Sequence, residues 1–530
     1  MLDKTEIRNL LNKRFSNDLH KKLSEIPLPC ELKDTYKAAE RIKTAIQNNE
    51  LIAIVGDYDV DGVVSTAIMA EFLTDMSTDF IIRIPNRFKD GYGLNSDIVN
   101  ELESVALIIT VDNGISANEA ADLCAKKGID LIITDHHIPP QILPQAYAII
   151  NPKQPECTFP NIEICGAQVA WYLVGALKEV CSLKNYDMGK FIDLLALAII
   201  ADMMELRDLN RILVRLGITR INSSKRACFE AIKCFYGKDK FEFDDISFLI
   251  APLINSAGRM DDASVSFKFL RSKTIDEANR YLDMITCFNN SRKEQEKALF
   301  ESSIKDVNDN EDIIVTWGNE WHEGVIGIVA SRLAKRYKKP AIVFSIDGCR
   351  AKGSARSVGK FDILALIASQ EKLLCGFGGH KGAAGLVIET NNLDEFKHAV
   401  NNSCFLQDLY DFSGSDEVLG EIDHNAIDYE LLEILEYFEP YGQRNPRPLF
   451  ELKSAKVKNT KFIGKEENHL KLILQKGGKS YEAIFFNYDY TPHVGDNIDL
   501  LVSVSKNSFR GLITPQLLIK EIYELKNQEK

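Results

Sequence analysis

Three aspartates stand at alternate positions of the segment Gly56-Asp57-Tyr58-Asp59-Val60-Asp61-Gly62, directly after the apolar run Leu51–Val55. Carboxylates about 5 Å apart repel each other by roughly 3 kcal/mol at an effective dielectric constant of about 20. A cation between them removes this repulsion, and Mg²⁺, Mn²⁺ and Ca²⁺ prefer oxygen ligands. The segment therefore predicts a divalent-cation site, and the alternative is a solvated acidic turn.

The triplet also matches the start of an EF-hand calcium loop, which has aspartates at positions 1, 3 and 5 and glycine at position 6. Position 12 of such a loop needs a bidentate glutamate, and here that position is Ile68. An EF-hand also needs a helix before the loop, whereas Leu51–Val55 is short and apolar, like a strand buried on both faces. A calcium-sensing function is therefore disfavoured.

The first quarter of the chain alternates apolar, strand-like segments with helical patterns, which predicts a doubly wound α/β sheet of parallel strands. The expected strands are Leu51–Val55, Phe80–Ile84, Ala106–Val111 and Asp130–Thr134, and the first three precede helices expected over Val63–Leu73, Ser96–Leu102 and Ser116–Lys127. In such sheets, ligands bind beyond the carboxyl ends of the strands. Asp112 follows the third strand and Asp135-His136-His137 follows the fourth, so we expect these residues beside the triplet.

These side chains suit two cations. The candidate ligands are Asp57, Asp59, Asp61, Asp112 and one of His136 and His137. Oxygen ligands with one histidine fit a pair of Mn²⁺ or Mg²⁺ ions, and the histidine favours Mn²⁺. Two such ions can activate a water and stabilise the attacking and leaving oxygens in phosphoester hydrolysis. Adjacent histidines cannot point the same way, so we expect one to ligate while the other orients it or contacts phosphate.

Length and composition bound the class of protein. The 530 residues predict about three domains, and a hydrophobic content of 45% with 27% charged residues is ordinary for a soluble protein. The segment Met1–Glu50 lacks a signal-peptide core, and the most apolar run, Leu194–Ala201, is too short to span a bilayer, so we expect a cytoplasmic protein. Eleven cysteines without a CxxC pair indicate reduced thiols, each expected in the core.

The net charge of −13 argues against a nucleic-acid partner, but local charge decides such binding. The segment from Arg332 to Lys360 is strongly basic and has a single acid, Asp347. A second basic stretch runs from Arg444 to Lys479. Both stretches favour a polyanionic partner, and the alternative is two solvated faces.

Read together, several segments resemble the DHH phosphoesterase superfamily and, within it, the RecJ family of single-strand-specific DNA exonucleases. The segments that carry the resemblance are Gly56–Gly62, Val111-Asp112-Asn113-Gly114, Thr134-Asp135-His136-His137, Ala201-Asp202, Asn255-Ser256-Ala257-Gly258-Arg259, Trp321-His322-Glu323-Gly324-Val325, Gly353-Ser354-Ala355-Arg356-Ser357 and Gly378-Gly379-His380. The resemblance covers nearly the whole chain. It departs from the family pattern only slightly, at Ser256 and at Met203-Met204-Glu205.

The resemblance implies roles for these residues. The implied metal ligands are Asp57, Asp59, Asp61, Asp112, His136 and Asp202, with Asp112 bridging two ions. His137 is implied to lie beside the metals, and Asp135 to hold a histidine from outside the ligand shell. Arg259, Ser354 and Arg356 are implied to capture a 5′ phosphate, Arg87 to hold the strand, and His380, in a glycine-rich turn, to contact phosphate near the metals.

The resemblance also implies the domain order. The expected domains are a helical extension (1–48), an α/β DHH catalytic domain (49–272), a connecting helix (273–311), a DHH-associated α/β domain (312–402) and a β-barrel of oligonucleotide-binding (OB) type (411–526). Such barrels hold single strands with basic and aromatic side chains. The candidates on the barrel are Lys456, Lys458, Lys461, Phe462, Phe485, Phe486, Tyr488 and Phe509, of which we expect fewer than half to contact bases.

The expected function is metal-dependent 5′ to 3′ exonuclease activity on single-stranded DNA, in recombination and repair. The expected protein is a monomer that binds single-stranded DNA, with a single-strand-binding protein and a helicase as further suggested partners. Two alternatives stay open. One is a phosphodiesterase of the same superfamily that acts on short oligonucleotides or cyclic dinucleotides, and the other is a non-catalytic DNA-binding scaffold.

Overall fold

The structure is a computed structural model that describes the chain except for residues 404–416, 465–466, 489, 510–511 and 524–530, and except for the side chains of 508 and 509. The chain forms two compact units. The first contains Met1–Ile26, Met203–Leu216 and Ser415–Lys530, and the second contains Pro27–Asp202 and Gly217–Gly414. Residues 1–48, expected as one helical extension, therefore contribute to both units.

A five-stranded parallel sheet organises the first part of the second unit. Its strands are β1 (Ile52–Val55), β2 (Phe80–Arg83), β3 (Leu107–Val111), β4 (Asp130–Thr134) and β5 (Ala148–Ile150), in the order β2-β1-β3-β4-β5. The expected α/β class with parallel strands is confirmed. Strands β1 and β3 are wholly buried, as their continuous apolar runs predict.

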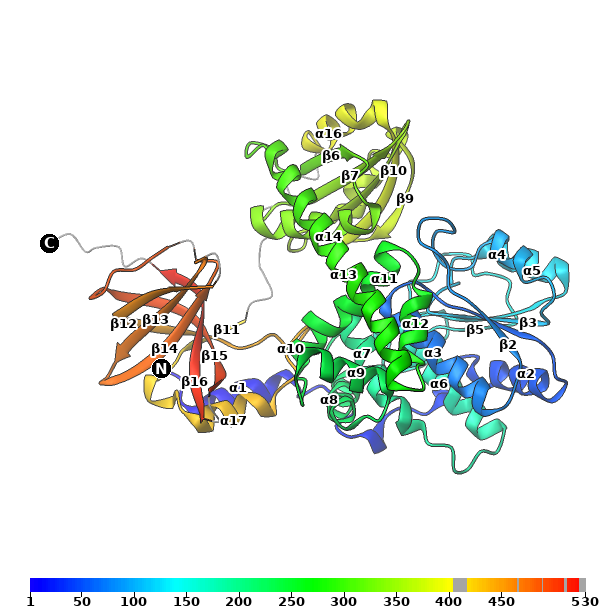
Figure 1. The fold of residues 1–530 in the computed structure, drawn as a ribbon, viewed down its shortest axis with the longest axis horizontal. Helices are drawn as coiled ribbons and strands as arrows, with labels where there is room; N and C mark the ends of the chain where they lie inside the picture. Colours follow the sequence, from blue (N-terminus) through cyan, green and yellow to red (C-terminus); the bar gives the residue numbers. More distant parts are fainter. Residues whose placement is uncertain (404–416, 465–466, 489, 510–511, 524–530) are drawn as a thin grey trace. The chain divides into compact units, whose positions relative to one another are not determined.

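Helices cover both faces of this sheet (Figure 1). On one face, α4 (Ser96–Glu101) and α5 (Asn118–Lys127) pack on alternate strand residues such as Ile108 and Ile133. The other face carries α2 (Thr35–Gln47), α3 (Val60–Asp75) and α6 (Gly166–Val180). Helix α3 begins three residues before its expected start at Val63, because the Asp59 side chain accepts the Gly62 N–H and caps it.

A helical region follows the sheet. Helix α7 (Ile192–Ala201) is buried and apolar except for Asp193, so it fixes Asp202 at its end. The other helices are α8 (Asp208–Ser223), α9 (Ala227–Tyr236), α10 (Phe243–Asp245), α11 (Ala251–Met260) and α12 (Ser264–Leu270), with a π-helical turn at Ile246–Ile250. The long helix α13 (Ile275–Ser303) occupies most of the range expected as a connecting helix.

A second five-stranded sheet has the order β6-β7-β8-β10-β9. Its elements are β6 (Ile314–Asn319), α14 (Glu323–Tyr337), β7 (Ala341–Asp347), β8 (Arg350–Arg356), α15 (Ile363–Ala368), β9 (Leu374–His380), β10 (Ala383–Glu389) and α16 (Leu393–Asn401). The expectation that His380 lies in a glycine-rich turn is wrong. Gly378-Gly379-His380 completes strand β9, and only Lys381-Gly382 makes the turn, because the ladder with β10 continues to His380.

The C-terminal strands close into a barrel, as expected. They are β11 (Val418–Glu421), β12 (Leu449–Ile463), β13 (His469–Lys476), β14 (Lys479–Phe486), β15 (Asn497–Phe509) and β16 (Leu512–Tyr523), and β12 pairs with both β13 and β15 to close the ring. Helices α1 (Lys4–Arg14) and α17 (Tyr429–Tyr437) contribute Ile7 and Leu435 to the core of this unit. The expected boundary at 411 lies outside the described residues.

The cysteines differ from expectation. All ten that the structure describes are unpaired, but only Cys124, Cys165 and Cys228 are buried. Cys375 is exposed although Leu374 precedes it, because strand β9 lies at the edge of its sheet. Among the helices in the described ranges, none is both long and apolar enough to cross a membrane.

Candidate metal centre

The aspartate triplet lies where the strand order of the first sheet reverses. Strands β2 and β3 pair with β1 on opposite sides, so the connections after β1 and β3 diverge at this point. Asp57 follows β1 and Asp112 follows β3, and both are nearly inaccessible, with exposures of 2% each. Asp112 has a left-handed backbone conformation (φ = 64°), which an aspartate tolerates better than most residues.

Helix ends hold the rest of the triplet. Asp59 is the cap of α3, and Asp61 lies in the first turn of that helix. One oxygen of Asp61 accepts the Gly166 N–H at 2.6 Å and the other accepts the Ala167 N–H at 2.9 Å, both at the start of α6. The start of a helix favours negative charge, so α6 fixes the Asp61 carboxylate in place.

His136 lies among three carboxylates. Its Nε2 is 3.3 Å from Asp112 Oδ1, 3.6 Å from Asp202 Oδ2 and 3.8 Å from Asp61 Oδ2. Burial and the neighbouring His137 lower the pKa of His136 to about 3, so its imidazole is neutral at physiological pH. A neutral imidazole is the form of histidine that binds metal ions.

Several buried oxygens in this cluster lack hydrogen-bond donors. Among the described residues, Asp57 Oδ1, Asp112 Oδ1 and Asp202 Oδ2 are buried without a hydrogen-bond partner. Burial, reinforced by neighbouring carboxylates, raises the pKa of all three residues well above the usual range and that of Asp61 to about 6. Buried acceptors without donors are rare in proteins, and cations would satisfy these oxygens and relieve the repulsion.

The cluster offers ligands for two cations. Asp57, Asp59 and Asp112 form one set of ligand atoms that lie within 4.8 Å of one another, and Asp61, His136 and Asp202 form a second. The two sets share no residue, and Asp112 also groups with both histidines. Carboxylates with one imidazole fit Mn²⁺ or Mg²⁺. The residues predicted as ligands are thus brought together at one edge of the sheet.

His137 and Asp135 form a charged pair beside this cluster. The ring Nδ1 of His137 lies 2.7 Å from Asp135 Oδ1, whose carboxylate also accepts the backbone N–H of Ile115 at 2.9 Å. Burial disfavours the imidazolium, but the contact with Asp135 outweighs it and raises the pKa of His137 to about 9. His137 is therefore protonated at neutral pH, unlike its neighbour.

Sequence reasoning missed three residues of the site. The Tyr92 hydroxyl donates to the Asp112 carbonyl at 3.2 Å and lies 3.3 Å from His137 Nδ1. Cys165 contacts the Asp61 carboxylate, and burial raises the pKa of its thiol well above the usual value, so the thiol stays protonated. Gly166 packs against Asp112. The one signal was a helix start with Cys165 as cap and Gln168 three residues later.

Three predicted arginines form a second cluster. Burial and the guanidinium groups of Arg87 and Arg356 lower the pKa of Arg259 to about 10, and burial and Arg87 lower that of Arg356. Arg87 also stacks on the Tyr58 ring at 4.5 Å. Ser354 Oγ accepts a hydrogen bond from Arg356 Nη1 at 3.0 Å. Asp59 offsets only part of these effects at Arg259, and three guanidinium groups this close together suit an anion.

The remaining candidates are less enclosed. His380 lies at the end of β9 and is exposed. Partial desolvation of its ring and, second, the positive charge of Arg356 lower its pKa. On the barrel, Lys456, Lys458, Lys461, Phe462 and Phe486 are exposed, whereas Phe485 is buried and Tyr488 is partly buried. The side chain of Phe509 lies outside the described residues. Phe462 and Tyr488 have ring centroids 5.7 Å apart.

Family models match three parts of the chain. The model described as the N-terminal domain of the DHH family matches residues 51–199. The DHHA1 domain model matches 310–404, and the RecJ OB domain model matches 420–521. These ranges fall on the first sheet, the second sheet and the barrel.

Several known proteins are similar to this chain over most of its length. The single-stranded-DNA-specific exonuclease RecJ of Bacillus subtilis is 33% identical over 95% of this chain, which spans 65% of that protein's length. RecJ of Haemophilus influenzae is 32% identical over 96% of this chain and 93% of its own length. The crystal structure of Thermus thermophilus RecJ in complex with Mn²⁺ is also similar, with a TM-score of 0.84 at 26% identity. The similarity covers 99% of this chain and 76% of the Thermus thermophilus chain. By this similarity, the chain belongs to the RecJ family of single-stranded-DNA-specific exonucleases, in the DHH superfamily.

Proposed function

We propose that this protein hydrolyses single-stranded DNA from the 5′ end, with Mn²⁺ or Mg²⁺ as cofactor, in DNA recombination and repair. One observation carries the proposal: the chain has both a candidate metal centre and a cluster of three arginines. The metal centre has two ligand sets, in which several buried carboxylate oxygens have no hydrogen-bond donor. The first cluster fits cations and the second fits phosphate, and phosphodiester hydrolysis needs both. Relatives named as RecJ exonucleases support the same substrate.

The candidate ligands divide between two cations. Asp57 and Asp59 would hold one cation, Asp61, His136 and Asp202 would hold the other, and Asp112 lies close enough to both sets to contact both. When bound, such cations activate a water and neutralise charge on the attacking and leaving oxygens. The start of α6 orients Asp61, and the buried end of α7 orients Asp202.

His137 supplies a proton in this scheme. Asp135 occupies its Nδ1, so the ring presents its Nε2–H to the scissile phosphate or the leaving 3′ oxygen. Asp135 keeps the imidazolium protonated, since it raises the pKa to about 9. His380 and Arg87 would contact phosphates of the same strand.

The polarity of cleavage follows from the arginine cluster. A terminal 5′ phosphate is a dianion with three free oxygens, and guanidinium groups bind such oxygens in pairs. Arg259 and Arg356, with Ser354, would capture this end and place the first phosphodiester at the cations. An internal phosphate carries one charge and binds more weakly, so the 5′ end is preferred.

The barrel would bind single-stranded DNA through its own exposed side chains. Its exposed candidates are Lys456, Lys458, Lys461, Phe462 and Phe486, which offer charge for phosphates and rings for bases. We place the protein in the cytoplasm, acting as a monomer, with a single-strand-binding protein and a helicase as suppliers of single strands. Unpaired cysteines accord with a reducing compartment.

Substrate length tests the proposal. The full-length protein with Mn²⁺ is given a 5′-phosphorylated strand of 30 nucleotides, the same strand in a duplex, and a dinucleotide, and released nucleotide is measured against an EDTA control. We expect release from the single strand at least about 100-fold faster than from the duplex. A preference for the dinucleotide would indicate a short-oligonucleotide phosphodiesterase, and no release with any metal would indicate a scaffold.

A further inference from the structure

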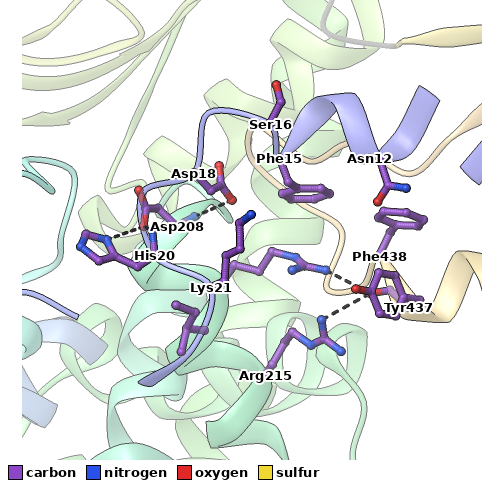
Figure 2. Close-up of a pocket in the computed structure, with 12 residues that line it drawn as sticks. Asn12, Phe15, Ser16, Asp18, His20, Lys21, Asp208, Arg215, Tyr437 and Phe438 are labelled. Carbon is purple, nitrogen blue, oxygen red and sulfur yellow. Dashed lines mark hydrogen bonds and ion pairs between the residues drawn. The ribbon is translucent and has the colours of Figure 1, made fainter. Parts of the chain in front are cut away.

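A pocket in the first unit belongs to neither cluster described so far. It has a volume of about 310 Å³ and lies between the end of α1, the first turns of α8 and the end of α17 (Figure 2). Its lining residues are Asn12, Phe15, Ser16, Asp18, His20, Lys21, Asp208, Arg211, Ile212, Arg215, Tyr437 and Phe438. A volume of this size accommodates a small ligand such as a nucleotide.

The two acids of the pocket already have hydrogen-bond partners. Asp208 accepts the backbone N–H groups of Leu19 at 3.0 Å and His20 at 2.9 Å, and it lies 2.7 Å from the ring Nδ1 of His20. Asp18 accepts two hydrogen bonds from Arg207, at 2.9 and 2.6 Å. These contacts of the two acids therefore fix the wall of the pocket.

Three cationic side chains line the pocket, namely Lys21, Arg211 and Arg215. Arg211 is held in place, since its guanidinium lies 4.3 Å from the centre of the Phe15 ring and donates to the Tyr437 carbonyl at 3.0 Å. Its Nε is buried and has no hydrogen-bond partner among the described residues. Burial and then the neighbouring Arg215 lower the pKa of Arg211 to about 10, and Asp18 offsets them in part.

Aromatic surface adjoins these cations. The Tyr437 ring is 63% exposed, and the Arg215 guanidinium lies 5.8 Å from its centre. Arg215 Nη1 also donates to the Tyr437 carbonyl at 3.3 Å, which keeps this arginine beside the ring (Figure 2). An exposed ring next to guanidinium groups is the combination that binds a base and its phosphate together.

We propose that this pocket binds the phosphate of a nucleotide between Lys21, Arg211 and Arg215, with the base against Tyr437. It uses no residue of the metal centre or of the arginine cluster, so it is a second nucleotide site and goes beyond the proposed function. The phosphate has two potential sources, a free mononucleotide and an internal phosphate of a DNA strand. The chemistry is the same for both, and the experiment separates them.

The test compares two double variants of the full-length protein. The pocket variant, Lys21→Ala/Arg215→Gln, removes two exposed cations that line the pocket. The control variant, Lys22→Ala/Arg220→Gln, removes two exposed cations outside the pocket, one next to Lys21 in sequence and one on α8. Calorimetric titration with deoxyadenosine monophosphate reports free-nucleotide binding. The affinity for a 5′-hydroxyl oligonucleotide at several salt concentrations reports strand binding.

Each source has its own signature. If free nucleotide is the ligand, one class of nucleotide sites binds about tenfold or more weakly in the pocket variant, and its affinity is unchanged in the control variant. If a strand phosphate is the ligand, the slope of log affinity against log salt falls by about 0.7 in the pocket variant only. The proposal is overturned if the pocket variant matches the control in both titrations. Because all four residues are exposed, we expect both variants to fold, and melting temperatures equal to that of the wild type verify this.

Discussion

Gly166, the first residue of α6, lies directly against the carboxylate of Asp112. A Cβ at position 166 would stand 2.3 Å from Asp112 Oδ1 and 2.5 Å from its Cβ, far inside van der Waals contact. The N–H of the same glycine donates to Asp61 at 2.6 Å. One residue without a side chain thus positions two candidate ligands of the metal centre.

Gly166→Ala should therefore impair the centre without removing a ligand. The added methyl displaces Asp112, and a displacement of about 1 Å costs on the order of 100-fold in rate. Nucleotide release and the Mn²⁺ dependence of the melting temperature measure the effect. Gly128→Asn is the control, because nothing lies within 4 Å of a Cβ there and asparagine tolerates its left-handed backbone. Wild-type activity in Gly166→Ala would remove the positioning role.

Asp112→Asn should separate metal binding from folding. The buried Asp112 carboxylate is disfavoured by burial and by Asp61, so neutralising it should leave the protein at least as stable in EDTA. Stabilisation by Mn²⁺ should shrink by about 1.4 kcal/mol for each tenfold loss of affinity. Thermal melts with and without Mn²⁺ measure both effects, and Asp122→Asn, exposed on α5, is the control. An unchanged Mn²⁺ shift would exclude Asp112 from the ligands.

The loss of stability between neutral and acid pH should depend on Glu71. Arg226, 2.8 Å from its carboxylate, and Lys190, at 3.1 Å, outweigh burial and lower its pKa. A lowered folded-state pKa means that the contribution is present above the unfolded value of about 4.3 and is lost as pH falls through the folded value. Glu71→Gln should cost roughly 2 kcal/mol at pH 7, because Arg226 keeps Asp193 as partner, and less at pH 3.

Urea unfolding at the two pH values checks this prediction. Asp122→Asn, exposed on α5 beyond its first turn, serves as the control and should change neither value. A Glu71→Gln deficit that is equal at both pH values would mean that the charge of Glu71 does not act through these cations.

Arg356→Ala should reveal how the 5′ end is recognised. Loss of a charge-assisted hydrogen bond to a terminal phosphate costs about 1.5 to 3 kcal/mol, so kcat/KM on 5′-phosphorylated strands should fall by about tenfold to 100-fold. Strands with a 5′ hydroxyl should lose less, since they lack the dianion. Arg350→Ala, exposed on the same strand β8, is the matched control. Equal losses on both ends would place Arg356 outside the end-binding pocket.

Sequence patterns predicted the first sheet closely and the details of the site incompletely. The four expected strands lie within one residue of β1 to β4, because buried parallel strands read as continuous apolar runs. That sheet alone places Asp57 and Asp112 at one edge, beside His136. The approach of Gly166 to Asp112 was not predictable, because it joins positions far apart in sequence through tertiary packing.

The local sequence pattern also failed to predict exposure where exposure depends on the position of a strand within its sheet. Cys375 and Gly378 follow apolar residues and were expected in the core and in a turn, yet both lie on the edge strand β9. An edge strand has a partner on one side only, and no local signal marks it as an edge. Similarly, Phe485 and Phe486 are adjacent and alike in sequence, but only Phe485 faces the barrel core.

The most direct test of the central claim is the direction of digestion. A 5′-phosphorylated single strand labelled at its 3′ end is incubated with the full-length protein and Mn²⁺, and the labelled products are separated by length over time. We predict that the label stays on progressively shorter strands and that Asp112→Asn yields none. Release of labelled mononucleotide from otherwise full-length strands, or unchanged digestion by Asp112→Asn, would contradict 5′ to 3′ hydrolysis at this metal centre.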